Sequence, residues 1–195
     1  MSDHIKIMLG DCLDRMTEIS DGSMDLVLAD PPYGTTACKW DAVIPFEPMW
    51  KQVWRVLKPN GAAVFTAGQP FSSALVMSEP KRFAYEWVWV KSKITGVLNA
   101  KKMPVRKHEQ ILVFCERKAT GIYNPQGLKA KGSVTRQGGN SDNYGSRPSA
   151  PYVQEWTNYP RDVLEVSSEG KTVHPTQKPV ALMEYLIRTY TDEGE

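Results

Sequence analysis

Short apolar runs alternate along this chain with longer segments whose apolar residues recur at helical spacing. The short runs predict β-strands at residues 5–9, 25–29, 62–67, 83–91 and 109–117. The helical spacing predicts α-helices within residues 10–19 and at 46–57, 69–79 and 180–190, the last with Pro179 at its first position. Strands that alternate with helices predict an α/β sandwich around a largely parallel sheet.

The segment from about residue 118 to 164 breaks this pattern. It is rich in Gly, Ser, Asn, Arg, Tyr and Pro, and "GSVTRQGGNSDNYGSRPSAP" has no apolar period. Such a composition cannot bury enough apolar surface to fix one conformation, so it predicts a mobile loop.

Composition indicates one folded domain. The 195 residues are 41% hydrophobic and 24% charged, as in ordinary globular proteins. Cys12, Cys38 and Cys115 are odd in number and widely spaced, which implies neither disulfides nor a metal site and suits the cytoplasm. No apolar run approaches the ~18 residues of a membrane span, and acidic residues follow the N-terminus too soon for a signal peptide.

Charge is unevenly distributed along the chain. The net charge is only +2, but residues 91–147 carry +9 and the rest of the chain carries −7. A cationic segment of this kind suits a polyanion such as nucleic acid. A solvated loop region would account for the same charges.

The stretch "LADPPYG", residues 28–34, is the strongest candidate for chemistry. Asp30 follows an apolar run at the end of a predicted strand, where α/β sheets bind ligands. The two prolines stiffen the turn, so that the Pro31 carbonyl faces outward and Tyr33 presents a flat ring near Asp30. Two acceptors beside an aromatic ring suit an extruded nucleobase with an exocyclic amino group. Alone, the four residues could equally form a rigid turn with a capping aspartate.

The sequence resembles the DNA amino-methyltransferases of the β class, in which the catalytic motif precedes the glycine-rich cofactor loop. The motifs "GDCLDRM", "DLVLADPPYG", "W.RVLKPNG", "QPF", "HE.ILVF" and "HPTQKPVALMEYLI" occur in the order of that family. The resemblance implies a Rossmann-like fold and site-specific methyl transfer from S-adenosylmethionine to adenine N6 in double-stranded DNA. Cytosine N4 is the alternative, and Asp rather than Ser at position 30 favours adenine.

The resemblance also implies three sets of site residues. The catalytic residues are Asp30, Pro31, Pro32 and Tyr33. The cofactor-binding residues are Asp11, Cys12, Asp30, His174, Thr176, Gln177 and Lys178, of which 176–178 would open a helix and present its N–H groups to the methionine carboxylate. The DNA-binding residues are Arg136 and Arg147, at the family's target-recognition position, together with Lys101, Lys102 and Arg106 of the cationic segment, and no metal ligands are expected.

Some of these residues have structural interpretations as well. Asp11 could cap the helix that follows it, and His174 could only orient its turn. His108 and Glu109 are expected to form a buried hydrogen-bonded pair, although they could instead face the target pocket. Trp40, close to the catalytic turn, could line that pocket.

The motifs divide the chain into residues 1–117 (catalytic part), 118–165 (target recognition) and 166–195 (the helix on the cofactor side). The family's strand and glycine-rich turn would follow Glu195, so we expect a truncated enzyme with an incomplete cofactor site. A catalytically weak DNA-binding fragment is therefore the competing hypothesis. The sequence leaves open the recognition sequence, a homodimer and a cognate restriction enzyme.

Overall fold

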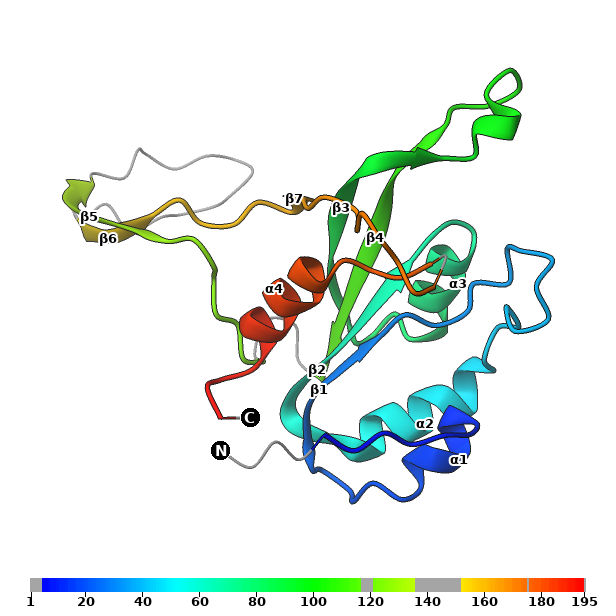
Figure 1. Ribbon diagram of the computed structural model, residues 1–195. Helices are drawn as coiled ribbons and strands as arrows, with labels where there is room; N and C mark the ends of the chain where they lie inside the picture. Colours follow the sequence, from blue (N-terminus) through cyan, green and yellow to red (C-terminus); the bar gives the residue numbers. More distant parts are fainter. Residues whose placement is uncertain (1–4, 117–120, 136–151, 175, 195) are drawn as a thin grey trace. The chain divides into compact units, whose positions relative to one another are not determined.

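The computed structural model describes residues 5–116, 121–135, 152–174 and 176–194, which fall into two units. The larger unit comprises Met1–Asn124 and Asp162–Glu195, and the smaller comprises Pro125–Arg161. The larger unit contains α1 (Cys12–Met16), β1 (Met24–Ala29), α2 (Phe46–Val56), β2 (Leu57–Ala67), α3 (Phe71–Ser78), β3 (Phe83–Thr95), the 3₁₀ turn η1 (Val97–Asn99), β4 (Arg106–Cys115), β7 (Val163–Glu165) and α4 (Val180–Tyr190) (Figure 1). The smaller contains β5 (Lys129–Thr135) and β6 (Tyr152–Thr157), which pair in antiparallel fashion.

The described strands of the larger unit form one sheet in the order β1-β2-β4-β3-β7. The β1–β2 and β3–β7 pairs are parallel, whereas β4 is antiparallel to both of its neighbours. Four of these five strands therefore point the same way, and the predicted α/β class with a largely parallel sheet is confirmed. β4 is the exception because it returns directly from β3 in a hairpin.

One face of the sheet is covered by α2 and α3. Met49, Trp50 and Val53 of α2 pack with Phe71 and Leu75 of α3 against buried side chains of β2 and β4. These α2 positions recur at helical spacing, which is why the helix buries one side only. Partly buried residues of α1 extend the same cluster.

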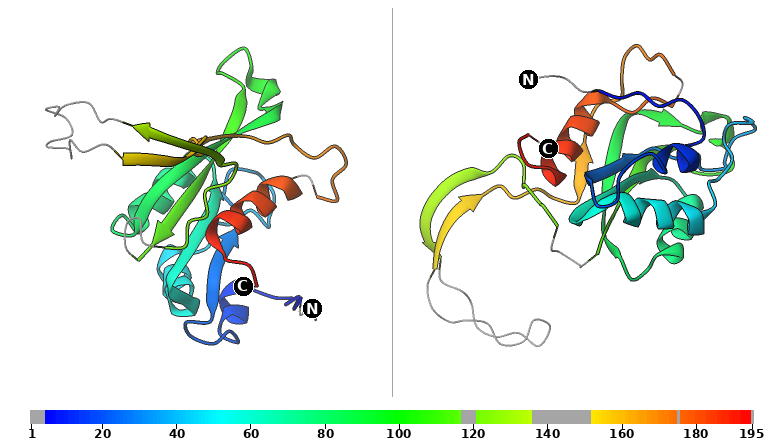
Figure 2. Two further views of the ribbon diagram at one scale, coloured as in Figure 1. Left: turned by 90° about the vertical axis from the view of Figure 1, so that its left-hand side faces the viewer. Right: turned by 90° about the horizontal axis from the view of Figure 1, so that it is seen from below.

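The other face of the sheet is covered by α4 (Figure 2). Leu182, Leu186 and Tyr190 of this helix pack on alternate residues of the central strands, including Trp87 of β3. The Tyr190 hydroxyl accepts a hydrogen bond of 2.6 Å from the Trp87 indole N–H. Since residues of β2 and β4 contribute to both faces, the paired segments 61–67 of β2 and 111–115 of β4 are buried, whereas β4 begins with exposed residues.

The topology brings several strand ends to one edge of the sheet. β1, β2, β3 and β7 all point toward this edge, so their carboxyl ends lie there, and antiparallel β4 begins there. In open α/β sheets this edge is where ligands bind. The segment between β7 and α4 continues from the same edge.

The structure corrects several sequence-based expectations. Residues 5–9 form no strand, and Ile5, Ile7 and Leu9 are at least 84% exposed, because none of the described strands pairs with them. β5, β6 and β7 lie in the segment predicted to be loop. These strands contain few apolar residues, so the sequence shows no strand period there. Pairing with β3 holds β7 in place. The "GSVTRQGGNSDNYGSRPSAP" core of that loop lies largely outside the described residues. Within the described part of the chain, no helix is both long and apolar enough to cross a membrane.

Candidate active site

The Asp30 carboxylate is anchored to the ends of two neighbouring strands. Asp30 directly follows β1, and Thr66 at the end of β2 donates a hydrogen bond of 2.5 Å from Oγ1 to Asp30 Oδ1. The Tyr33 hydroxyl lies 3.1 Å from the same oxygen and 3.0 Å from Thr66 Oγ1. Burial, together with the negative charge of Asp30, raises the pKa of Tyr33, so this hydroxyl stays a neutral donor.

The Tyr33 ring already has one aromatic partner. It stacks on Phe71 of α3 with ring centroids 5.2 Å apart and an interplanar angle of 19°. The Lys178 ammonium lies 5.7 Å from the Tyr33 ring centroid. One ring face is therefore covered by protein, which fixes the ring beside Asp30.

The loop after the turn is held by Asp41. Its two carboxylate oxygens accept hydrogen bonds of 2.7 to 2.9 Å from the backbone amides of Gly34, Thr35 and Thr36. Burial alone would raise the pKa of Asp41, but these hydrogen bonds outweigh it and lower the pKa to about 2. Gly34 has φ +67°, and a Cβ there would lie 2.8 Å from Val43, so the loop requires glycine.

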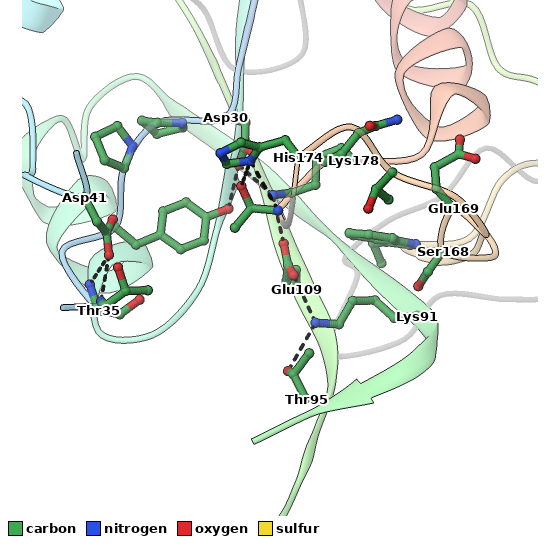
Figure 3. A pocket seen from close by; sticks show the side chains of 18 of the residues that line it. Asp30, Thr35, Asp41, Lys91, Thr95, Glu109, Ser168, Glu169, His174 and Lys178 are labelled. Atoms are coloured by element: carbon green, nitrogen blue, oxygen red, sulfur yellow. Dashed lines mark hydrogen bonds and ion pairs between the residues drawn. The ribbon is translucent and has the colours of Figure 1, made fainter. Parts of the chain in front are cut away.

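A chain of ion pairs crosses the site (Figure 3). Lys178 Nζ lies 2.7 Å from Asp30 Oδ1 and 3.5 Å from Glu109 Oε2. Glu109 Oε1 in turn accepts a hydrogen bond of 3.0 Å from Lys91 of β3. Both lysine side chains are only 9% exposed, so each cation is compensated by a carboxylate.

Two carboxylate oxygens in this cluster accept no hydrogen bond from the described residues. Glu109 Oε2 is buried and makes no hydrogen bond to the described residues. Asp30 Oδ1 accepts from Thr66, Tyr33 and Lys178, whereas none of the described donors binds Asp30 Oδ2. Asp30 Oδ2 can accept a hydrogen bond from a ligand, whereas Glu109 Oε2 becomes accessible only if the Lys178 ammonium, 3.5 Å away, moves.

These groups border a cavity of about 620 Å³. It is lined by the turn after β1, by Trp89, Lys91 and Thr95 of β3, by Glu109, and by the segment that precedes α4. A second cavity of about 320 Å³ shares five lining residues with the first: Tyr33, Thr35, Lys91, Thr95 and Glu109. These shared residues therefore lie between the two cavities.

Comparison with protein families identifies the chain. The family model described as DNA methylase, for N6 and N4 methyltransferases, matches residues 24–195. The chain belongs to this DNA methylase family. The matched region includes the Asp30 turn, the ion-pair cluster and the segment before α4.

Several relatives are similar to this chain along nearly its whole length. The type II methyltransferase M.HpaI of Haemophilus parainfluenzae is 24% identical, and M.BglII of Bacillus subtilis is 26% identical. The DNA adenine methyltransferase YhdJ of Escherichia coli K12 is 28% identical. Each match covers 97% of this chain but only 61%, 57% and 68% of the respective relative. The chain thus spans about three fifths of the length of the first two.

Solved structures confirm the predicted methyltransferase fold. The PvuII DNA methyltransferase, which is cytosine-N4-specific, superposes with a TM-score of 0.64 at 14% identity, covering 94% of this chain and 69% of that one. The complex of M1.HpyAVI with SAM superposes with a TM-score of 0.54 at 21% identity, covering 92% and 72%. At such identities the likeness concerns the fold.

His174, Thr176, Gln177 and Lys178 line the cavity, with one correction to their predicted setting. The His174 ring nitrogen Nδ1 is 2.9 Å from Thr176 Oγ1, and Gln177 Oε1 accepts from the Val173 amide at 3.0 Å. Residues 176–178 do not open the helix: α4 begins at Val180 with Pro179 as its N-cap. The first helical amide already binds Glu169 Oε1 at 2.9 Å. The helix end therefore does not present free N–H groups through residues 176–178.

Two predicted cofactor residues do not line this cavity. Asp11 is the N-cap of α1, accepting a hydrogen bond of 2.8 Å from the Leu13 amide, and Cys12 is the exposed first residue of that helix. Burial of part of its side chain and the nearby Asp11 raise the pKa of Cys12, so its thiol is not activated. The contact of both residues with a cofactor stays a prediction.

Three of the predicted DNA-binding residues are described by the structure, and all three lie in the β3–β4 hairpin. Lys101 and Lys102 are exposed in its loop, and Arg106 is exposed at the start of β4 beside the second cavity. Arg136 and Arg147 lie outside the described residues.

The expected His108–Glu109 pair is wrong. His108 is exposed, and Glu109 binds Lys91 instead, because adjacent side chains of a strand point to opposite sides. Sequence reasoning also missed Thr66, Lys91 and Asp41 as parts of the site. Thr66 and Lys91 each stand near the end of an apolar run that predicts a strand. Only the strand order shows that these strands end at the same edge of the sheet. Trp40 lines the cavity, and its contact with a target base stays a prediction.

Proposed function

We propose that this chain carries the catalytic site of a site-specific DNA methyltransferase that transfers a methyl group from S-adenosylmethionine to adenine N6 in duplex DNA. One observation carries this proposal. The Asp30 carboxylate lies at the carboxyl edge of the sheet with Oδ1 anchored by Thr66 and Tyr33, which leaves Oδ2 to accept a hydrogen bond from a ligand in the cavity.

The reacting amino nitrogen is a weak nucleophile because its lone pair is delocalised into the base. We assign its two N–H groups to Asp30 Oδ2 and to the Pro31 carbonyl, two acceptors on one side of the nitrogen. These hydrogen bonds favour a pyramidal nitrogen whose lone pair points away from both acceptors. Asp30 or a water molecule then takes the proton that the nitrogen loses once it carries the methyl group. Positioning and electrostatics supply the rate.

The cavity suits S-adenosylmethionine in size and charge. Its volume of about 620 Å³ is typical of a small-molecule site. Glu109 Oε2, which has no hydrogen-bond donor among the described residues, can accept a hydrogen bond from a cationic ligand once Lys178, now 3.5 Å away, moves. When bound, the cofactor supplies a methyl group on a positively charged sulfur. The residues that we propose to hold it in this cavity are Asp30, His174, Thr176, Gln177 and Lys178. We propose that Asp11 and Cys12 contact a part of the cofactor that extends beyond this cavity.

Lys178 has a specific task in this proposal. In the present structure its ammonium group binds Asp30 and lies near Glu109. Binding the methionine carboxylate requires Lys178 to leave Asp30. Its departure would also open Asp30 to the target base.

The choice of adenine rests on Asp30 and on the similarity to YhdJ, which is named as an adenine methyltransferase. Cytosine N4 is the second candidate, because its amino group offers the same two N–H donors to Asp30 and Pro31. We further propose the cytoplasm as the compartment, since Cys12 and Cys38 are exposed thiols. A homodimer and a cognate restriction enzyme are the partners that fit a methylase of this kind.

The test is to incubate the purified chain with unmethylated DNA and S-adenosylmethionine carrying an isotope-labelled methyl group. Nucleosides from the digested DNA are then separated by mass spectrometry. The proposal predicts label in N6-methyldeoxyadenosine. Label in N4-methyldeoxycytidine would select the second candidate, and DNA without label would contradict methyl transfer by this chain. Calorimetric titration with S-adenosylmethionine identifies the weak DNA-binding fragment, which would bind DNA but not the cofactor.

A further inference from the structure

The β3–β4 hairpin ends in an exposed apolar tip. Val97 and Met103 are 58% and 52% exposed, and Leu98 is fully exposed. Figure 1 shows the hairpin reaching away from the helices of the larger unit, with its loop at the far end. Side chains of this kind at a projecting tip have no role in the core.

The backbone of this tip is well held. Gly96 adopts φ +80° and begins the turn η1, in which Asn99 and Ala100 donate hydrogen bonds of 3.0 Å to the carbonyls of Gly96 and Val97. Lys102 and Met103 both donate to the Asn99 carbonyl, at 2.8 and 3.0 Å. The tip therefore presents Leu98 from a turn with its own hydrogen bonds.

The charge around the tip selects the kind of partner. Lys101, Lys102, Arg106 and Lys107 are exposed on the loop and on the beginning of β4. No acidic residue occurs between positions 92 and 108. Apolar side chains surrounded by cations alone suit a partner with an anionic backbone and an apolar interior, which describes duplex DNA.

The hairpin is continuous with the candidate active site. Thr95, the last residue of β3, lines both cavities, and it pairs with Arg106, which lines the second. Leu98 follows Thr95 by only three residues. A duplex that contacts the tip is therefore held beside the cavity that would receive a base.

We propose that the tip acts as a wedge in the DNA: Leu98, flanked by Val97 and Met103, enters the base stack and fills the space left by the base that turns into the cavity. Lys101 and Lys102 bind the neighbouring phosphates. This inference rests on the proposed function, since only an enzyme that works on an extruded base needs such a wedge.

The test compares binding to two duplexes of the same sequence, one fully paired and one with a single abasic site. The measurement is fluorescence anisotropy, which needs neither the cofactor nor knowledge of the recognition sequence. The wild-type chain is expected to bind the abasic duplex about tenfold more tightly, because the gap removes part of the unstacking cost. Leu98→Ala should abolish this preference, and Leu98→Met should retain it. Met77→Ala is the matched control, since Met77 is 73% exposed on α3.

The outcomes separate the wedge from the function on which it rests. A preference for the abasic duplex that survives in Leu98→Ala would overturn the wedge, and so would equal binding of both duplexes by the wild-type chain. Failure of the wild-type chain to bind either duplex would instead contradict the proposed function. Sedimentation of both proteins gives an independent result: a dimer that Leu98→Ala converts to a monomer would make the tip a contact between copies of this chain.

Discussion

At the scale of single residues, the hydroxyl groups of Tyr33 and Thr66 determine how the Asp30 carboxylate is presented. Thr66 donates to Asp30 Oδ1, and Tyr33 can donate either to that oxygen or to Thr66. A carboxylate held in this way needs little reorganisation when a base arrives. The arrangement gives the Tyr33 hydroxyl a role separate from that of its ring.

We predict that Tyr33→Phe lowers kcat about tenfold and changes the KM for DNA little. The ring would still stack on Phe71, but one hydrogen bond worth roughly 1 to 2 kcal/mol would be lost from the carboxylate network. Steady-state kinetics measure both constants. Tyr185→Phe on α4 is the control, because Tyr185 lies outside the cavity lining. A kcat equal to that of the wild type would contradict this role.

The sequence identifies Asp30 and Tyr33 because they lie only three positions apart in a short motif. It does not identify their partners, since Thr66, Glu109 and Lys178 are distant along the chain and meet only at the edge of the sheet. A pairwise contact of this kind depends on strand order. Strand order in turn depends on which strands share a core, and a single sequence does not display that.

At the scale of elements, the loop 34–41 stays in place through one carboxylate. The pKa of Asp41 is about 2 in the folded chain and near 3.8 in an ordinary setting. A carboxyl group whose pKa is lowered by folding stabilises the fold above its unfolded pKa, and this contribution disappears as the pH falls through the folded pKa.

We therefore predict that Asp41→Asn lowers the free energy of unfolding at neutral pH, and that its difference from the wild type shrinks between pH 4 and pH 2. The asparagine carries no charge and offers one acceptor oxygen to the three amides. Urea unfolding at a series of pH values measures this difference. A difference that is the same at both pH values would show that the Asp41 charge does not hold the loop.

The α4 helix offers a matched pair of neighbouring residues. Leu186 is completely buried against the sheet, whereas Ile187 is 45% exposed. Leu186→Ala should lower the free energy of unfolding by about 2 to 5 kcal/mol, because it leaves a cavity in the core. Ile187→Ala should cost about 1 kcal/mol or less. Equal losses measured by chemical denaturation would mean that α4 packs on another face.

Periodic patterns in the sequence predicted the packed helices correctly. They failed for segments whose structure depends on pairing with another strand. α2 and α4 each have an apolar stripe at helical spacing, so both helices were predicted nearly to their boundaries. Residues 5–9 have the pattern of a strand but no described partner, and β7 has a partner but only three residues. A strand exists through its neighbours, so local pattern is a weaker guide to strands than to helices.

At the scale of the whole molecule, the basic segment predicts a strong salt dependence of DNA binding. Replacing both Lys101 and Lys102 with alanine should make the slope of log affinity against log salt shallower by up to about 2, close to one for each lost phosphate contact. Fluorescence anisotropy at several salt concentrations gives the slope. The control replaces Lys51 and Lys81, two exposed lysines outside the segment. An unchanged slope would mean that Lys101 and Lys102 only face solvent.

The central claim is that the Asp30 carboxylate binds the target amino group and so makes methyl transfer to DNA possible. The variant Asp30→Ala tests this claim most directly. Asp14→Ala in the exposed first turn of α1 serves as the control. The measurement is transfer of labelled methyl groups from S-adenosylmethionine to DNA, with the DNA Kd determined on the same samples. We predict loss of transfer by Asp30→Ala with a nearly unchanged Kd. A variant that keeps more than about a tenth of the wild-type kcat/KM would lose less than ~1.4 kcal/mol of transition-state stabilisation, and that result would contradict the account.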